Sequence, residues 1–310
     1  MPLSAFGLGG GSSLSSHPHL HRLPPLHRWC AAVGTRNPRT AAALVLVVCV
    51  AAPAAYLALA KRSLGRRTEG RPARVWSQRS GSAKDDDGEG ILAGTFAPLP
   101  DEVTASEADA GLVVARETVR SLPFPVASLK PEFVRRRPGL GRGLGLDADA
   151  GAGADAEVSE VDKDAMVSTF LRTSMRLFTR TPQAVLMRRL MTTGDAAASF
   201  GAPYLDACAF AVGDRVCGVY VVAERRAADG AAVLRLSPPE GWSGPRPEGL
   251  IFVAVVEDRD GGGELRFVNE TLLWRRADGA PTVLESRVGA WLHELMVRWF
   301  VVRALDAVTV

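Results

Sequence analysis

The polar and aromatic residues with the most unusual spacing lie in the stretch FVNETLLWRR, residues 267–276. Its apolar and β-branched content is typical of a strand. Successive strand residues face opposite sides of a sheet, so Glu270 and Trp274 share one face and Asn269 faces away. A buried Glu270 would have a raised pKa and could act as an acid or a base. We expect Glu270 instead at the surface, paired with Arg266 or another basic residue.

Asn269 also begins the tripeptide Asn-Glu-Thr, which is an acceptor pattern for N-glycosylation. Acceptor sites that are used lie on surface loops, whereas this one lies in the middle of the predicted strand. We therefore interpret the match as accidental. It does not argue against a cytosolic or mitochondrial domain.

His293 is the only histidine after residue 27, and it lies beside the apolar stripe of the last predicted helix. One histidine cannot form a multi-histidine metal site. A Ser-His-Asp arrangement can assemble from distant positions, but the chain contains no Gly-x-Ser-x-Gly nucleophile turn. We expect His293 to be structural or partly exposed. If the domain is an enzyme, the candidate titratable groups are Glu270, Glu285 and His293, so the sequence leaves the question of an enzyme open.

Other motifs predict neither a metal site nor a cofactor. The histidine-rich residues 17–21 flank a proline in a predicted tail, and GLGRGLG, residues 139–145, follows no predicted strand and does not fit the dinucleotide fingerprint. Residues 147–155 lack the ligand spacing of a calcium loop. From residue 160 onward 18 Lys and Arg stand against 19 Asp and Glu, which gives no electrostatic case for nucleic-acid binding.

Periodicity and turn signals predict an α+β domain over residues 161–310. Apolar residues recur with helical spacing over residues 166–178, and Thr181-Pro182 is typical of an N-cap followed by the first helical position. Strand-like segments follow, and Asp-Gly and Gly-rich turns between them favour antiparallel hairpins. These segments are residues 215–224, 231–237, 250–257 and 265–275.

A long helix is predicted at the end of the chain. Thr282 and Glu285 have capping-box spacing, and Glu294 and Arg298 are expected to pair on its solvent side. Its apolar stripe comprises Leu284, Val288, Trp291, Leu292, Leu295 and Trp299. The predicted fold is thus α+β: a curved antiparallel sheet of four to six strands packed on this helix, with two helices preceding the strands and a single N-terminal transmembrane helix.

The first 160 residues are predicted to lack a core of their own. Residues 1–40 form a basic, disordered tail that could be a targeting segment, residues 61–111 form a disordered tether, and residues 139–160 form a low-complexity linker. Residues 112–138 are strand-like but are interrupted by prolines, so we expect them to add an edge strand.

Residues 41–60 are 20 uncharged residues, long enough for one membrane span. Seven basic residues follow between Lys61 and Arg79, against four between Arg22 and Arg39, so the positive-inside rule places the C-terminal domain in the cytosol. The acid-free, Ser- and Arg-rich tail is also typical of a mitochondrial transit peptide, which leaves the inner membrane as the alternative.

Cys208 and Cys217 lie nine residues apart and could pair across a hairpin. Two cysteines do not make a disulfide framework. We expect both to be small buried residues.

Four stretches carry a resemblance to a known group: RTPQAVLMRRL, GDRVCGVYVV, FVNETLLWRR and PTVLESRVGAWLHEL. Over residues 161–309 the chain resembles a family of single-span membrane proteins of filamentous fungi that carries no assigned chemistry. It is more distantly similar to helix-grip (START-like) domains, in which a curved sheet wraps a C-terminal helix around an apolar ligand. That resemblance implies a ligand cavity, although here the first clear helices precede most strands, which leaves NTF2-like and hot-dog folds open.

Three functions remain in competition. The first is a membrane-anchored domain that holds a lipid or another hydrophobic small molecule between sheet and helix, with Glu270, Trp274, Trp291 and His293 as candidate ligand-binding residues. The second is an enzyme of the same shape, such as an isomerase, cyclase or thioesterase. The third is a non-catalytic scaffold or assembly factor of a membrane complex, with an exposed apolar patch.

Overall fold

The computed structural model describes residues 52–77, 95–98, 103, 111–136, 159–242, 246, 248–258 and 263–310. Residues 59–310 form one compact unit, separate from residues 1–58, and contain all of the described strands. Helix α3 (Ala52–Gly65) begins in the first unit and ends in the second.

A large antiparallel sheet confirms the expected α+β class, although it has eight strands among the described residues instead of four to six. Its order is β1-β2-β10-β9-β8-β7-β6, and β3 pairs with the start of β10. The strands are β1 (Thr68–Ser77), β2 (Leu112–Ser121), β3 (Phe124–Pro125), β6 (Arg215–Val216), β7 (Tyr220–Arg226), β8 (Ala231–Leu236), β9 (Glu248–Glu257) and β10 (Glu264–Arg276). The last five form successive hairpins, as the turn signals predict.

Five helices accompany this sheet in the described part of the chain after residue 160. They are α5 (Lys163–Phe178), α6 (Pro182–Leu190), α7 (Gly194–Ala198), α8 (Ala202–Ala207) and the C-terminal α9 (Arg287–Val308). Short elements are η4 (Val126–Ser128), η5 (Pro131–Phe133), η6 (Val283–Glu285) and a separate pair of strands, β4 (Val134–Arg136) and β5 (Ser159–Val161). Thr181 caps α6 as predicted, since its side chain accepts from Ala184 N–H. Thr282 and Glu285 form the predicted capping box, but it caps η6 and not the long helix. The N-cap of α9 is Ser286, whose side chain accepts from Gly289 N–H.

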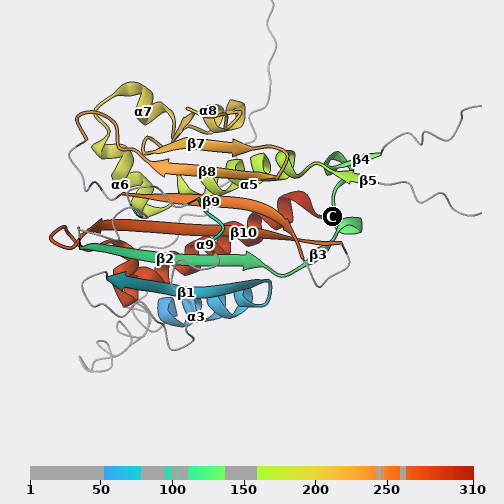
Figure 1. Cartoon of the computed structure of the whole chain (residues 1–310), viewed down its shortest axis with the longest axis horizontal. Coiled ribbons are helices and arrows are strands. Elements are labelled where there is room, and N and C mark those ends of the chain that lie inside the picture. The colour runs from blue at the N-terminus through green and yellow to red at the C-terminus, as the bar shows by residue number, and fades with distance from the viewer. Residues whose placement is uncertain are drawn as a thin grey trace, which may run out of the picture. The chain divides into compact units, whose positions relative to one another are not determined.

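The main core lies between the sheet and helices α5 and α9. Helix α9 contacts β1, β2 and β10, α5 contacts β8 and β9, and the two helices contact each other on the same side of the sheet (Figure 1). Phe267 of β10 packs against Phe170 of α5, with ring centroids 5.2 Å apart. Burial of apolar side chains at about 25 cal/mol per Å² is the main force that holds this layer together.

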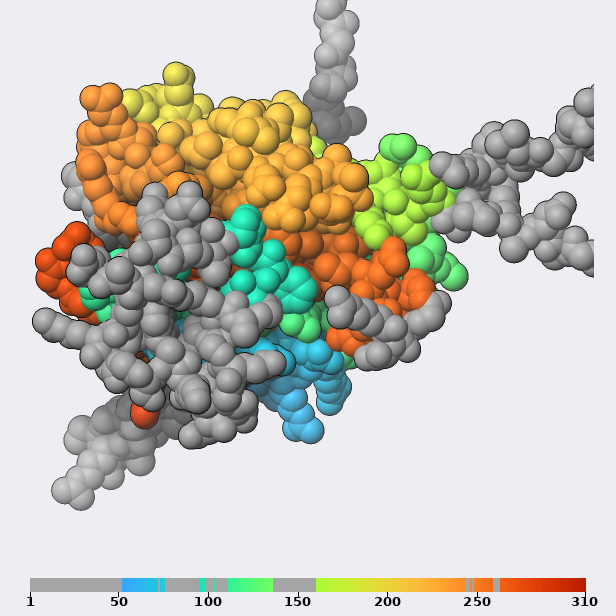
Figure 2. All heavy atoms as spheres, in the orientation of Figure 1, coloured from blue at the N-terminus to red at the C-terminus, as the bar shows by residue number. Residues whose placement is uncertain are grey.

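The opposite face of the sheet is also covered. Residues 95–98 lie on it, in teal in Figure 2, and Phe96 stacks on Phe252 of β9 with ring centroids 6.4 Å apart. Leu272 and Trp274 of β10 are buried in this second apolar cluster. Both faces of the central strands are therefore buried, which agrees with their apolar residues on both sides.

The structure corrects the expected roles of the residues before 160. Strand β1 lies within the predicted tether 61–111, and β2 lies between β1 and β10 instead of at an edge. Pro123 and Pro125 follow β2, so they do not interrupt its pairing. The domain predicted over residues 161–310 consequently takes three strands of its sheet, β1, β2 and β3, from earlier in the chain.

Helix α9 is held over β1 by charged residues that were expected on its solvent side. Glu294 and Arg298 form the predicted i, i+4 pair, 2.7 Å apart, but both are buried. Arg298 also donates to the backbone oxygen of Thr68. A Cβ added at Gly70 would lie 2.5 Å from the Arg298 guanidinium, so this glycine allows the close approach. Arg298 is bonded both to Glu294 of its own helix and to Thr68 of β1, so the pair holds α9 in position against β1.

The predicted tail 1–40 and residues 41–51 of the predicted span lie outside the described residues, as do residues 139–158 of the linker. Residues 52–60 form the first part of α3. Among the helices that the structure describes, none has both the length and the apolar character needed to cross a membrane.

Candidate functional site

A cavity lies between the sheet, α6 and the start of α9. Its wider part has a volume of about 270 Å³, and an adjoining narrow part of about 40 Å³ extends toward α5. Both parts are lined by Tyr220, Ile251, Thr271, His293 and Met296. On this scale one water molecule needs about 10–15 Å³, so the narrow part suits a small chemical group and the wide part a larger body.

The wide part is mainly apolar. Leucine, methionine and valine side chains of α6, β8, β10, η6 and α9 form most of its wall, together with Val219 and Trp242. Leu186, at its edge on α6, is 59 % exposed, and Val283 of η6 is also exposed. No Lys, Arg, Asp or Glu is among the described residues that line either part.

The narrow part carries the polar groups. Asn269 and Thr271 face α9 from β10 because strand alternation puts them in phase with Phe267 of the main core. Ser174 reaches the same space from α5. Burial raises the pKa of the Tyr220 phenol above its ordinary value, so this side chain stays neutral there.

His293 is bound to a buried carboxylate. Its Nδ1 lies 2.8 Å from Oε1 of Glu117, which stands opposite Thr271 across the β2–β10 pair. When Glu117 is ionised it can only accept a hydrogen bond, and Nδ1 of His293 is then the donor. In the neutral ring Nε2 then presents a lone pair, which can accept a hydrogen bond or take up a proton.

Three buried polar atoms beside this pair have no hydrogen-bond partner among the described residues. They are Oε2 of Glu117, Oγ of Ser174 and Oδ1 of Asn269. A buried polar atom without a partner costs about 1–3 kcal/mol, and such atoms call for an explanation. Ser174 and Asn269 both line the narrow part of the cavity, which indicates a site prepared for a polar group from outside the chain.

Of the four candidate ligand-binding residues, only His293 lines the cavity. Glu270 lies on the opposite face of the sheet and is fully buried at 0 % exposure, so the expected surface position is wrong. Its carboxylate accepts from Arg116 at 2.7 Å, from Thr118 and from the backbone N–H of Ala97. A carboxylate with all these donors is a structural anchor for the segment that covers this face.

The two tryptophans among the candidates lie elsewhere. Trp274 shares the face of Glu270, as predicted, and its Nε1 donates to Glu248 at 2.7 Å. Trp291 packs beneath the ammonium of Lys61, 5.7 Å from its ring centroid. Glu285, the remaining enzyme candidate, is paired with Arg275 at 2.7 Å. The stripe from Trp291 to Trp299 therefore does not form the cavity wall, which on α9 consists of His293, Met296, Val297 and Phe300.

The residues missed by sequence reasoning are Glu117, Ser174 and Thr271. Glu117 is the only charged residue on a strand face that otherwise carries Val113, Ala115 and Val119. A lone carboxylate on an apolar face is a usable signal. A strand at the edge of the sheet would leave such a carboxylate near solvent, whereas β2 lies between β1 and β10. The two cysteines are free and buried, as predicted.

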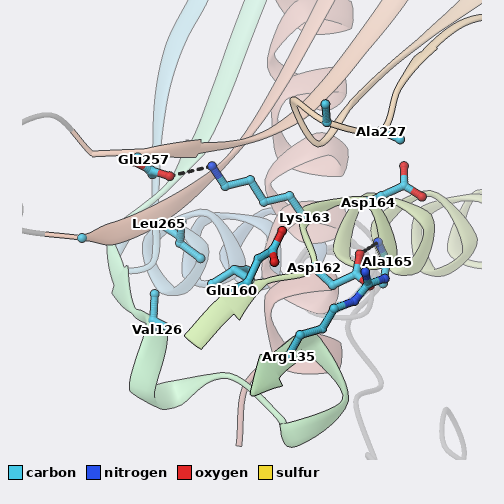
Figure 3. A pocket seen from close by; sticks show the side chains of 13 residues that line it. Val126, Arg135, Glu160, Asp162, Lys163, Asp164, Ala165, Ala227, Glu257 and Leu265 are labelled. Carbon is cyan, nitrogen blue, oxygen red and sulfur yellow. Dashed lines mark hydrogen bonds and ion pairs between the residues drawn. The ribbon is translucent and has the colours of Figure 1, made fainter. Parts of the chain in front are cut away.

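A second hollow of about 760 Å³ lies at the start of α5, beside β4 and β5 (Figure 3). Two ion pairs lie within it, and its Asp164 pairs with Arg225 outside the lining. Lys163 pairs with Glu257 at 2.7 Å, and Arg135 pairs with Asp162 at 2.6 Å. It offers no unpartnered buried polar atom among the described residues that line it, and is the weaker candidate.

Comparison of the chain with models of known families, with curated proteins and with solved structures found no match. The resemblance to single-span fungal proteins and to helix-grip domains therefore stays a prediction.

Proposed function

We propose that this domain binds a hydrophobic small molecule or lipid in the cavity between its sheet and α9. The observation that carries the proposal is an apolar cavity of about 270 Å³ that ends in a narrow part with buried, unpartnered polar atoms. Binding sites for small molecules combine these two features, a mostly apolar wall and few polar groups. In this proposal the sheet holds α9 in the manner of a helix-grip domain.

The sequence adds a membrane to the proposal. Residues 41–60 are apolar enough for one span, which would hold the domain next to a bilayer, on the cytosolic side or at the mitochondrial inner membrane. The exposed Leu186 and Val283 at the edge of the cavity favour entry of a ligand from apolar surroundings.

An acid–base enzyme of the same shape is the second candidate. It is favoured by the Glu117–His293 pair, since a carboxylate that holds a histidine by Nδ1 leaves Nε2 free to move a proton. Isomerisation and cyclisation need such a group beside an apolar substrate. The scaffold hypothesis has less support, because Trp299 packs against Phe300 and is only partly exposed.

Identification of copurified molecules tests the proposal. The full chain would be purified from a eukaryotic host, extracted with organic solvent and analysed by mass spectrometry, beside Ile251→Trp, which adds bulk to both parts of the cavity. We expect one small molecule per chain in the wild type and a loss of at least tenfold in the variant. Val256→Trp, on the opposite face of the same strand, is the matched control and should retain the molecule. Equal recovery from Ile251→Trp would contradict the proposal.

A further inference from the structure

We infer that the ligand of this cavity is an uncharged alcohol whose hydroxyl group occupies the narrow part, between Ser174, Asn269 and His293. The inference rests on the proposed function and names the chemical class of its ligand. Size, charge and hydrogen-bonding capacity each restrict the polar end of the ligand.

Size excludes large polar groups. The narrow part has about 40 Å³, and a cavity needs about 10–15 Å³ on this scale to hold one water molecule. A hydroxyl group fits this volume, but a phosphocholine does not. The wide part, at about 270 Å³, accommodates a much larger body.

Charge disfavours an anion. The described residues that line the two parts include no Lys or Arg. The carboxylate of Glu117 lies beside His293 and, when ionised, repels a second carboxylate. A fatty-acid anion would thus lose its hydration without gaining a counter-charge.

Hydrogen-bonding capacity favours a group that both donates and accepts. The carbonyl oxygen Oδ1 of Asn269 only accepts, and Nε2 of His293 accepts when Glu117 holds the proton on Nδ1. Oγ of Ser174 can donate. An alcohol hydroxyl can donate to one of the two acceptors, Asn269 or His293, and at the same time accept a hydrogen bond from Ser174. An ether can only accept and leaves the acceptors unpaired.

Titration calorimetry with three matched ten-carbon probes tests the inference. The full chain would be titrated with decan-1-ol, 1-methoxydecane and sodium decanoate at pH 7.5. We expect decan-1-ol to bind about tenfold more tightly than each of the others, since one buried hydrogen bond contributes about a factor of ten. Asn269→Leu removes one of the two acceptors and should reduce the preference for decan-1-ol over 1-methoxydecane. Thr118→Val, a polar-to-apolar change on the other face, should keep the tenfold preference.

The outcomes separate the inference from the proposed function. Equal binding of the alcohol and the ether, or tighter binding of decanoate, would overturn the inference and leave an apolar cavity site in place. Binding of none of the three probes would overturn the proposed function as well. The relative affinities of the three probes for the wild-type chain test the inference even where a variant fails to fold.

Discussion

Asn269 and Glu270 are adjacent buried polar residues whose replacement should have opposite effects on stability. Oδ1 of Asn269 has no partner among the described residues, and the side chain is 6 % exposed between Val119 and Val253 of the neighbouring strands. Asn269→Leu removes the unpaired atom and adds apolar area. An unpaired buried polar atom costs about 1–3 kcal/mol, so we expect the free energy of unfolding to rise by about 1 kcal/mol.

Glu270→Leu should do the reverse. It leaves the Arg116 guanidinium without its carboxylate and removes the acceptor of Thr118 and of the Ala97 N–H. Removal of one partner of a buried ion pair costs about 3–5 kcal/mol. For a domain of this size each kcal/mol shifts the melting temperature by about 2–4 °C.

Urea denaturation and thermal melting of the full chain, with its two variants, measure both effects. Copurified ligand must be removed first, because a bound ligand stabilises the folded state by mass action. A loss of stability in Asn269→Leu as large as that in Glu270→Leu would refute the reasoning, since it would mean that Asn269 is satisfied in the unliganded protein.

Three further predictions use other parts of the domain. Leu186→Trp, at the edge of the cavity, should weaken binding of decan-1-ol at least fivefold, whereas Val185→Trp, its 45 % exposed neighbour outside the cavity lining, should bind as the wild type does in calorimetry. The Arg275 guanidinium beside Glu285 lowers the pKa of that carboxyl, so its stabilising contribution is present above the ordinary pKa of about 4.3 and is lost as the pH falls through the lower folded-state value. Glu285→Gln should therefore lower the free energy of unfolding at pH 7 and make it fall less between pH 7 and pH 3, as measured by urea denaturation. The same pH dependence of stability in the variant and the wild type would contradict the pairing. Burial raises the pKa of the Cys217 thiol to about 12. In a chain whose cysteines before residue 60 are replaced by serine, a thiol reagent at pH 8 should therefore modify Cys217 only after unfolding. Fast modification of the native chain would contradict this, because it would show that the thiol is accessible.

Local signals made the C-terminal half of the fold predictable. Thr181-Pro182 and Thr282 with Glu285 mark helix starts by hydrogen bonds within four residues, and the Asp-Gly turns mark hairpins in the same way. The role of β2 has no such signal. It pairs with β10 over a separation of about 150 residues, and the strand pattern alone does not name a distant partner.

The site was predictable only in part, because the sequence pattern of β10 does not show what each of its faces packs against. Alternation correctly placed Asn269 and Glu270 on opposite faces. It could not show which face meets α9, because β10 is apolar on both sides: Phe267 is in phase with Asn269, and Leu272 and Trp274 are in phase with Glu270. The carboxylate of Glu270 is fully paired, whereas Oδ1 of Asn269 has no partner among the described residues, and no sequence pattern distinguishes the two.

A crystal structure of the full chain, purified without removal of bound molecules, tests the central claim most directly. The account predicts electron density for one small molecule whose apolar body lies between α6 and β10 and whose polar end is within hydrogen-bond distance of Asn269 or His293. A cavity closed by its own side chains, with Oδ1 of Asn269 and Oγ of Ser174 paired inside the protein, would contradict it.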